Sequence, residues 1–222
     1  MIQLHQVSKH FRNETAIRYS DMVFEDGHSY LLLGASGCGK STLLNLIAGI
    51  ISPDTGEITI NGRVMTNESQ QVRDAFRIRS IGYIFQDFKL IEDMTVQDNI
   101  DILRLEGVDV SRAAGLFATL GMQEKRNKKV RQLSGGEKQR VAIVRALVKQ
   151  PDIILADEPT GNLNFSIGEQ VMRELAETAR GKTLITVTHD ERLASYFDHV
   201  VDMNEMTSGG LFDAPSDSRE VM

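Results

Sequence analysis

The sequence has few of the features that mark secreted or membrane-spanning proteins. Its 222 residues contain one cysteine, Cys38, which excludes an internal disulfide framework. No apolar run approaches the ~20 residues that cross a bilayer. The N-terminus lacks a basic stretch followed by an apolar one, which a signal peptide would have. We therefore expect a cytoplasmic chain that does not insert into a membrane, with any membrane role supplied by a partner.

Positively charged residues are fewer than negatively charged ones. The formal net charge is −6 and the pI is about 5.4, so the overall basic field typical of nucleic-acid binders is missing. A basic run at 125–131 contains no aromatic residue, which favours a solvated loop. Hydrophobic residues make up 41% of the chain. A chain of this length suits one large domain, or one domain with a subdomain.

One glycine-rich segment organises the rest of the chain. It comprises Gly34, Ala35, Ser36, Gly37, Cys38, Gly39, Lys40 and Ser41. This fits the pattern G-x-x-x-x-G-K-[ST] of a phosphate-binding loop. The apolar run 30–33 before it predicts a buried strand, and 42–48 after it predicts a helix. Strand, loop and helix in this order favour phosphate binding over an ordinary glycine-rich turn.

The chemistry of the loop follows from its residue types. Glycines let successive backbone N–H groups point inward at phosphate oxygens, and the helix that starts at Thr42 adds free N–H groups and the positive end of its dipole. Lys40 is placed to reach the outer phosphates, and the Ser41 hydroxyl to ligate Mg²⁺. Cys38 is either an oxidation target or, the simpler interpretation, a small residue that fits the loop.

A second glycine motif comprises Leu133, Ser134, Gly135, Gly136 and Glu137. Ser134 with Glu137 forms a capping box, which predicts a helix start. A cap does not require two glycines, and glycine is a poor helix former, so the backbone here should approach something closely. The hydroxyl, the free N–H groups and the helix dipole all suit an anion. The motif is a second candidate phosphate site.

Four predicted buried strands, at 30–33, 81–85, 153–156 and 183–188, each end in polar residues. In an open parallel sheet, ligands bind outside the carboxyl ends of the strands. One crevice should therefore collect Lys40, Ser41, Gln86, Asp157, Glu158 and His189. That set suits Mg²⁺-dependent phosphoryl transfer to water. Asp157 would hold the metal's hydration shell, Glu158 would polarise the attacking water, Gln86 would touch metal and water, and His189 would donate to the γ-phosphate.

The remaining segments predict a small antiparallel sheet beside this core. Strands are expected at 2–7, 17–24, 29–33 and 56–60, with hairpin turns at Asp26-Gly27 and Asn61-Gly62, and a last strand at 200–203. Helices are expected at 69–79, 95–105, 110–120 and 166–179. The arginines of 69–79 favour a solvated face, with contact to a membrane or partner as the alternative. The composition from residue 207 onward predicts a loose tail.

The order of these motifs resembles the ATP-binding cassette (ABC) ATPases over residues 2–205, and the match of 133–137 to the family signature is highly specific. The resemblance implies a P-loop NTPase, RecA-like, parallel-sheet core with an antiparallel β subdomain and an inserted α-helical subdomain. It also implies that Phe11 stacks on adenine, that Gln86 senses Mg²⁺ and the transport partner, that Glu158 is the catalytic glutamate, and that His189 is the switch histidine.

The resemblance implies further that two chains sandwich two ATP molecules, with Ser134 and Gly136 of one chain facing the phosphate loop of the other. Residues 1–206 would form one domain, with its helical subdomain at about 88–150 and a tail from 207 to 222. Segments 81–86 and 158–163 look most like the subgroup of macrolide exporters, lipoprotein exporters and the cell-division ATPase. Asn164 stands where the family usually has Asp, which puts the coupling of the two ATP sites in doubt, and Val130 replaces a common proline.

We therefore expect an ATPase subunit of an ABC transporter or mechanotransmitting complex, a homodimer bound to membrane permease subunits. Two alternatives stay open. A soluble ABC ATPase that acts on nucleic acid or ribosomes is disfavoured by the acidic charge and by the single cassette without long coiled coils. A regulatory protein that binds ATP with little turnover is disfavoured by Glu158 and His189, although Asn164 leaves room for it.

Overall fold

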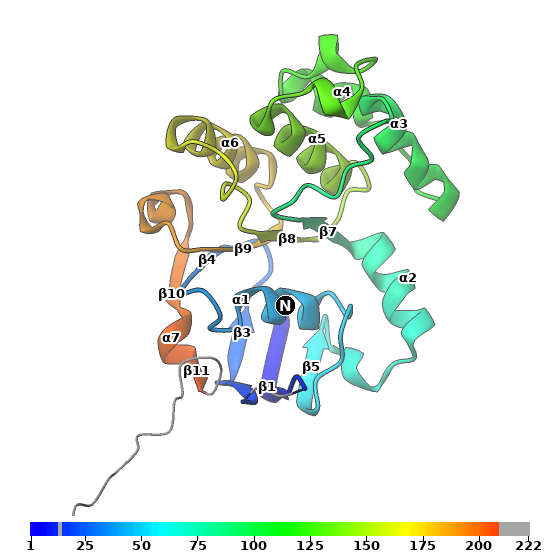
Figure 1. The fold of residues 1–222 in the computed structure, drawn as a ribbon. Helices are drawn as coiled ribbons and strands as arrows, with labels where there is room; N and C mark the ends of the chain where they lie inside the picture. Colours follow the sequence, from blue (N-terminus) through cyan, green and yellow to red (C-terminus); the bar gives the residue numbers. More distant parts are fainter. Residues whose placement is uncertain (13–14, 209–222) are drawn as a thin grey trace, which may run out of the picture.

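Two sheets form the framework of the protein (Figure 1). The computed structural model describes residues 1–12 and 15–208. The central sheet is parallel and has the strand order β10-β4-β9-β8-β7. Its strands are β4 Ser29–Leu33, β7 Ile81–Ile84, β8 Ile153–Asp157, β9 Thr183–Thr188 and β10 His199–Asp202. The four predicted buried strands thus lie in one sheet.

The register of the parallel sheet aligns the carboxyl ends of its strands. Leu33 pairs with Thr188, Asp157 with Val187, and Ile84 with Ala156. Since all five strands point the same way, the segments that follow β4, β7, β8 and β9 leave the sheet at one edge. The predicted crevice requires this arrangement.

The second sheet is antiparallel. It comprises β1 Ile2–Lys9, β2 Ile17–Tyr19, β3 Met22–Phe24, β5 Thr55–Ile60, β6 Arg63–Val64 and β11 Thr207–Ser208. Asn61 and Gly62 form the predicted hairpin turn between β5 and β6, with φ values of 52° and 77°. Both residues have a left-handed backbone conformation, which the favoured two-residue hairpin turn requires.

One strand prediction and one turn prediction are wrong. The expected strand 17–24 is divided into β2 and β3, because the Asp21 carboxylate turns to β1, where it accepts the Gln6 N–H at 2.7 Å and contacts the His5 ring at 2.6 Å. Asp26-Gly27 is a turn but not a hairpin turn. The strand before it, β3, pairs with β1, whereas β4 after it lies between β9 and β10 in the other sheet.

The longer helices are α1 Lys40–Ile47, α2 Gln70–Ser80, α3 Val96–Asp101, α4 Ala113–Thr119, α5 Gly135–Leu147 and α6 Phe165–Thr178. Short 3₁₀-helices occupy Met65–Asn67, Ile102–Glu106, Gln123–Lys125, Val130–Gln132 and Glu191–Tyr196. The predicted helix 95–105 is thus an α-helix only to Asp101. Among the described residues, no helix is long and apolar enough to cross a bilayer.

The predicted C-terminal features are corrected in part. The last strand ends at Asp202, because the Asp202 carboxylate caps the short helix α7 Met203–Met206. Thr207 and Ser208, which were expected in the loose tail, form β11 and pair with Tyr19 and Arg18. The rest of the predicted tail, 209–222, lies outside the described residues, and the predicted subdomain boundaries stay a prediction.

The parallel sheet separates two hydrophobic cores, because alternate side chains of each strand face opposite sides. Leu32, Leu155 and Ile185 pack toward α1 and the antiparallel sheet. Leu31 and Ile154 pack on the other face, in the core shared with α5, α6 and the helical segment around Phe117. Figure 1 shows α5 and α6 on one face of the sheet and α1 on the other. This layering leaves the carboxyl ends of the strands uncovered.

Candidate functional site

A cavity of about 370 Å³ lies at the carboxyl ends of the parallel strands. It is lined by Phe11, Ile17, Ser36, Gly37, Gly39, Lys40, Ser41, Thr42, Gln86, Glu158 and His189. Five of the six residues predicted for the crevice line this cavity. The sixth, Asp157, lies beside it, since its Oδ1 accepts a 2.8 Å hydrogen bond from the Ser41 hydroxyl. The structure therefore brings the whole predicted set together.

The glycine loop holds Lys40 at the cavity wall. Lys40 is only 7% exposed, and its Nζ donates to the carbonyl oxygens of Gly34 at 2.6 Å and Ala35 at 2.9 Å. Gly39 has a φ of 99°, and a Cβ there would lie 2.9 Å from the Tyr19 hydroxyl. Glycine is needed at that position on both counts. Helix α1 follows at once, so its free N–H groups face the cavity.

Three predicted loop residues do not line the cavity. Gly34 and Ala35 contribute the carbonyl groups that hold Lys40. The Cys38 side chain is buried in the core next to Gly34, where its Sγ lies 2.8 Å from the position of an added Gly34 Cβ. The interpretation of Cys38 as a small residue that fits the loop agrees with this burial.

Burial dominates the electrostatics of Asp157. It raises the pKa of this carboxyl group above its ordinary value, and the neighbouring Glu158 charge acts in the same direction. The Ser41 hydrogen bond and the Lys40 charge only partly oppose the increase. A partly desolvated carboxylate with a hydroxyl partner is better stabilised by a cation close to it.

Glu158 combines backbone strain with a fixed side chain. Its φ of 43° is unusual for a residue other than glycine, and its N–H donates to the Val187 carbonyl at 3.0 Å. One carboxylate oxygen accepts the Thr188 hydroxyl at 3.1 Å, and the other lies 3.2 Å from His189 Nδ1. Strained residues held by their surroundings cluster at functional sites. The strand ends of β8 and β9 thus place a carboxylate and an imidazole side by side.

Gln86 reaches the cavity from β7 and is held by the turn that follows β8. Asn162 Nδ2 donates to the Gln86 carbonyl at 2.7 Å, and Gln86 Nε2 lies 3.3 Å from the position of an added Cβ on Gly161. Asn162 and Thr188 are supporting residues that sequence reasoning missed. Thr188 adjoins His189 at a strand end, which is the signal that could have identified it.

The second glycine motif lies apart from this cavity. The capping box is confirmed: the Ser134 hydroxyl accepts the Glu137 N–H, and the Glu137 carboxylate accepts the Ser134 N–H. A Cβ on Gly135 would lie 3.1 Å from Leu163 Cδ2, and one on Gly136 would lie 2.6 Å from Ile167 Cγ2. Within the chain, both glycines therefore lie close to the segment before α6 and to its start, and the second phosphate site stays a prediction.

Two further residues singled out from the sequence have structural roles. Asn164 caps α6, because its Oδ1 accepts the Ile167 N–H at 3.0 Å. An amide serves this role as well as the carboxylate that the family pattern leads one to expect. Val130 is fully buried in the core on the α5 side.

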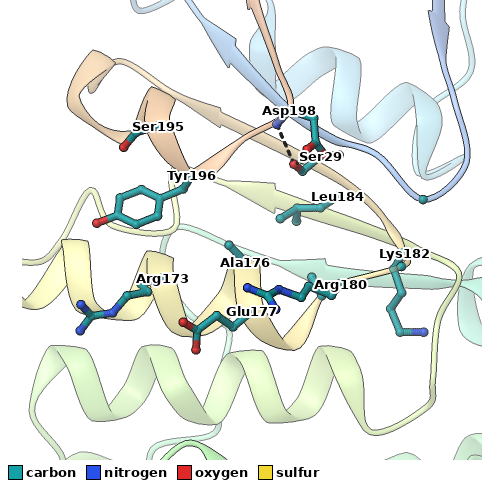
Figure 2. A pocket seen from close by; sticks show the side chains of 13 residues that line it. Ser29, Arg173, Ala176, Glu177, Arg180, Lys182, Leu184, Ser195, Tyr196 and Asp198 are labelled. Atoms are coloured by element: carbon teal, nitrogen blue, oxygen red, sulfur yellow. Dashed lines mark hydrogen bonds between the residues drawn. The ribbon is translucent and has the colours of Figure 1, made fainter.

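A larger hollow of about 510 Å³ lies near the opposite ends of β4 and β9, beside the C-terminal half of α6 (Figure 2). None of the predicted site residues lines it. Asp198 is engaged by the N–H and hydroxyl groups of Ser29, and Lys182 donates to the Pro151 carbonyl. Figure 2 shows Arg173, Glu177 and Lys182 extending to different sides rather than toward a common point. Size alone does not mark this hollow as the site.

The fold and the first cavity define a class of protein. A phosphate-binding loop between a parallel strand and a helix, with carboxylates at the ends of neighbouring strands, is the site of a P-loop nucleotide-binding protein.

Comparison with known proteins defines the family. The ABC transporter family model matches residues 17–161. An uncharacterised ABC transporter ATP-binding protein of Mycobacterium tuberculosis is 44% identical over 214 residues, which cover 91% of this chain and 86% of that protein. The lipoprotein-releasing system ATP-binding protein LolD of Bacteroides fragilis is 38% identical over 214 residues, which cover 92% and 99%.

A solved dimer of the ATP-binding cassette MJ0796, in a post-hydrolysis state bound to ADP and Pi, superposes with a TM-score of 0.81. It shares 31% identity with this chain, and the match covers 94% of this chain and 98% of that one. The chain therefore belongs to the ABC transporter family, as the motif order predicts. It is an ATP-binding subunit that hydrolyses ATP, and neither alternative function is favoured.

Proposed function

We propose that this chain couples Mg²⁺-dependent ATP hydrolysis, at a site shared by two copies, to movement of a membrane permease. The observation that carries the proposal is the convergence of Lys40, Ser41, Gln86, Glu158 and His189 on one cavity. Lys40 and the N–H groups at the start of α1 bind the phosphates. Phe11, which lines the same cavity, stacks on adenine.

The residues at the cavity fit Mg²⁺. Among the described residues, no three His, Cys, Asp or Glu side chains cluster as a dedicated metal cage. Mg²⁺ prefers one or two carboxylates together with water and substrate phosphates. Asp157, the Ser41 hydroxyl and the Gln86 amide supply that limited oxygen set. When bound, Mg²⁺ neutralises part of the phosphate charge.

Glu158 acts as the base for water. Its strained backbone and the Thr188 hydrogen bond keep its carboxylate at the cavity wall. His189, whose Nδ1 lies 3.2 Å from Glu158, donates to the γ-phosphate. Because phosphoryl transfer depends mainly on positioning and charge neutralisation, these contacts account for most of what the protein has to supply.

A second copy of the chain completes the site. Ser134, Gly135, Gly136 and Glu137 lie at the start of α5 and outside the cavity of their own chain. They would face the phosphate loop of a partner copy, and the dimeric state of the MJ0796 cassette supports a homodimer. ATP would then join the two copies, and hydrolysis would release them.

The permease contacts the helical segment 88–150 and the groove near Gln86, which places the complex on the cytoplasmic face of a membrane. The test is affinity purification of the tagged chain from solubilised membranes, with ATP turnover measured for the chain alone and in the recovered complex. An integral membrane protein that co-purifies and alters turnover supports the proposal. Recovery of nucleic acid or ribosomes in place of a membrane protein refutes it.

A further inference from the structure

A buried tyrosine contacts the end of the phosphate-binding loop from outside the nucleotide cavity. Tyr19 lies in β2, is only 4% exposed, and does not line the cavity. Its hydroxyl donates to the carbonyl oxygen of Gly39 at 2.9 Å, and a Cβ on Gly39 would lie 2.9 Å from that hydroxyl. The phenol and the loop are therefore in direct contact at the residue that precedes Lys40.

Strand pairing on both sides fixes the backbone of Tyr19. Strand β2 lies between β1 and β11, and Tyr19 pairs with Thr207 of β11. The N–H of the next residue, Ser20, donates to the Met206 carbonyl at 2.9 Å. Figure 1 shows how α7 brings the chain from β10 to β11. Because its side chain is buried and its strand is paired on both edges, Tyr19 is a rigid support for the loop.

The Tyr19 hydroxyl keeps its proton and can act as a donor. Burial raises the pKa of the phenol well above its ordinary value, and a hydrogen bond with the Thr42 side chain opposes the increase only in part. The Gly39 carbonyl also accepts the Leu43 N–H at 2.9 Å, which is the first backbone bond of α1. Both lone pairs of this carbonyl are in use, and the helix bond does not depend on the phenol.

The peptide group between Gly39 and Lys40 transmits this contact to the cavity. A trans peptide is planar, so its C=O and N–H groups point in opposite directions. Because the Gly39 carbonyl points to Tyr19 in the core, the Lys40 N–H points the other way, toward the cavity that Gly39 and Lys40 line. Gly39, at a φ of 99°, has no side chain to restrict rotation of this peptide. A donor on the carbonyl also polarises the peptide, which strengthens its N–H as a donor.

We propose that Tyr19 is a positioning residue of the nucleotide site, whose hydroxyl holds the Gly39–Lys40 peptide so that the Lys40 N–H donates to a nucleotide phosphate. This role rests on the proposed function, since it requires phosphates in the cavity. Tyr19 itself does not contact the nucleotide and takes no part in the chemical step. Loss of its hydroxyl should therefore weaken the binding of ADP and ATP alike and leave kcat unchanged.

The first test is Tyr19→Phe, which removes the hydroxyl but keeps the buried ring and the Leu43 bond. The dissociation constant of ADP, measured by calorimetry on the full chain, should rise about fivefold, as expected for one lost hydrogen bond. KM for ATP should rise by a similar factor, while kcat stays within about twofold of wild type. Tyr30→Phe is the matched control, because the buried Tyr30 hydroxyl accepts the Glu25 N–H at 2.8 Å, away from the cavity. This variant should bind ADP as wild type does.

Isotope labelling gives a second readout, on the peptide itself. The sequence contains two glycine–lysine pairs, Gly39–Lys40 and Gly181–Lys182. With carbonyl-¹³C glycine and ¹⁵N lysine, only these two peptides give signals in a carbonyl–amide correlation spectrum, so the second pair is an internal reference. In the nucleotide-free chain, Tyr19→Phe should move the Gly39 carbonyl signal upfield, because the carbonyl loses a hydrogen bond. In the wild-type chain, ADP should move the Lys40 amide proton downfield, and the reference pair should stay in place.

Four results would overturn this role of Tyr19. The first is wild-type ADP affinity in Tyr19→Phe, and the second is an equal loss of affinity in Tyr30→Phe, which would indicate general loosening of the core. The third is a lower kcat at unchanged KM, which would place Tyr19 in the chemical step. The fourth is a Lys40 amide signal that ADP does not move in the wild-type chain, whether or not the variant folds. If the wild-type chain binds neither ADP nor ATP, the proposed function itself fails.

Discussion

Replacing Lys149 by methionine should make the isolated chain more stable at pH 7. The pKa of Lys149 falls from 10.5 to about 8 in the folded chain, which corresponds to about 3 kcal/mol at about 1.36 kcal/mol for each pH unit. Methionine keeps the aliphatic stem but loses the hydrogen bond to the Arg77 carbonyl, which costs about 1 kcal/mol. The expected net gain is about 2 kcal/mol. For a chain of this size it raises the melting temperature by roughly 4–8 °C.

The pH dependence gives the sign of the effect. The folded pKa of Lys149 lies below the unfolded value, so folding is penalised wherever both states carry the proton. As the pH rises from about 8 toward 10.5, the folded state loses its proton first and the wild-type chain gains stability. The advantage of the methionine variant should therefore be full at pH 7 and small at pH 10.

Thermal and urea unfolding of both chains at pH 7 and pH 10 measures this difference. Arg79→Met is the matched control, because it removes an exposed cation, and we expect it to change stability by no more than about 0.5 kcal/mol. A Lys149→Met chain that is no more stable than wild type at pH 7 would show that the Lys149 charge does not destabilise the folded chain. So would a stability difference that is the same at both pH values.

Two further substitutions test the packing and the metal site. Gly136→Ala places a methyl group 2.6 Å from Cγ2 of the stiff Ile167 side chain, and this clash should lower the free energy of unfolding in urea by about 1–3 kcal/mol. Adding Ile167→Ala to the same chain should restore part of the lost stability. A double variant without any recovery would contradict the clash. Asp157→Asn removes a carboxylate whose pKa is raised by burial and keeps an acceptor for the Ser41 hydroxyl. The nucleotide-free variant should therefore melt at a higher temperature than wild type, while Mg²⁺-dependent phosphate release is lost. A lower melting temperature would show that the buried charge of Asp157 does not destabilise the chain.

The convergence of these residues on one cavity can be predicted from the sequence because its signals are local. Each strand that enters the site is a short apolar run followed directly by its polar residue, as with Asp157 after β8 and His189 after β9. Parallel strands share one edge for such residues, so their convergence follows once the strands are identified. The order of the strands in the sheet is not needed for that prediction.

Other features depend on contacts between distant segments, which no local pattern reveals. The break in the expected strand 17–24 results from the Asp21 carboxylate turning to β1. The depressed pKa of Lys149 depends on α2 and α5 enclosing its side chain. The close contact between Gly136 and Ile167 joins the start of α5 to α6, and the signature motif does not reveal it. In each case, tertiary packing determines what the side chain does.

In the proposed function, Glu158 activates water at an ATP site that joins two copies of the chain. The direct test is Glu158→Gln, because the amide keeps the size of the side chain and still accepts the Thr188 hydrogen bond but cannot take a proton from water. Steady-state phosphate release should be compared with the oligomeric state in Mg²⁺ and ATP. We predict that the variant binds ATP, loses turnover and accumulates as a dimer. Near-normal steady-state hydrolysis by this variant would remove Glu158 from the role of base.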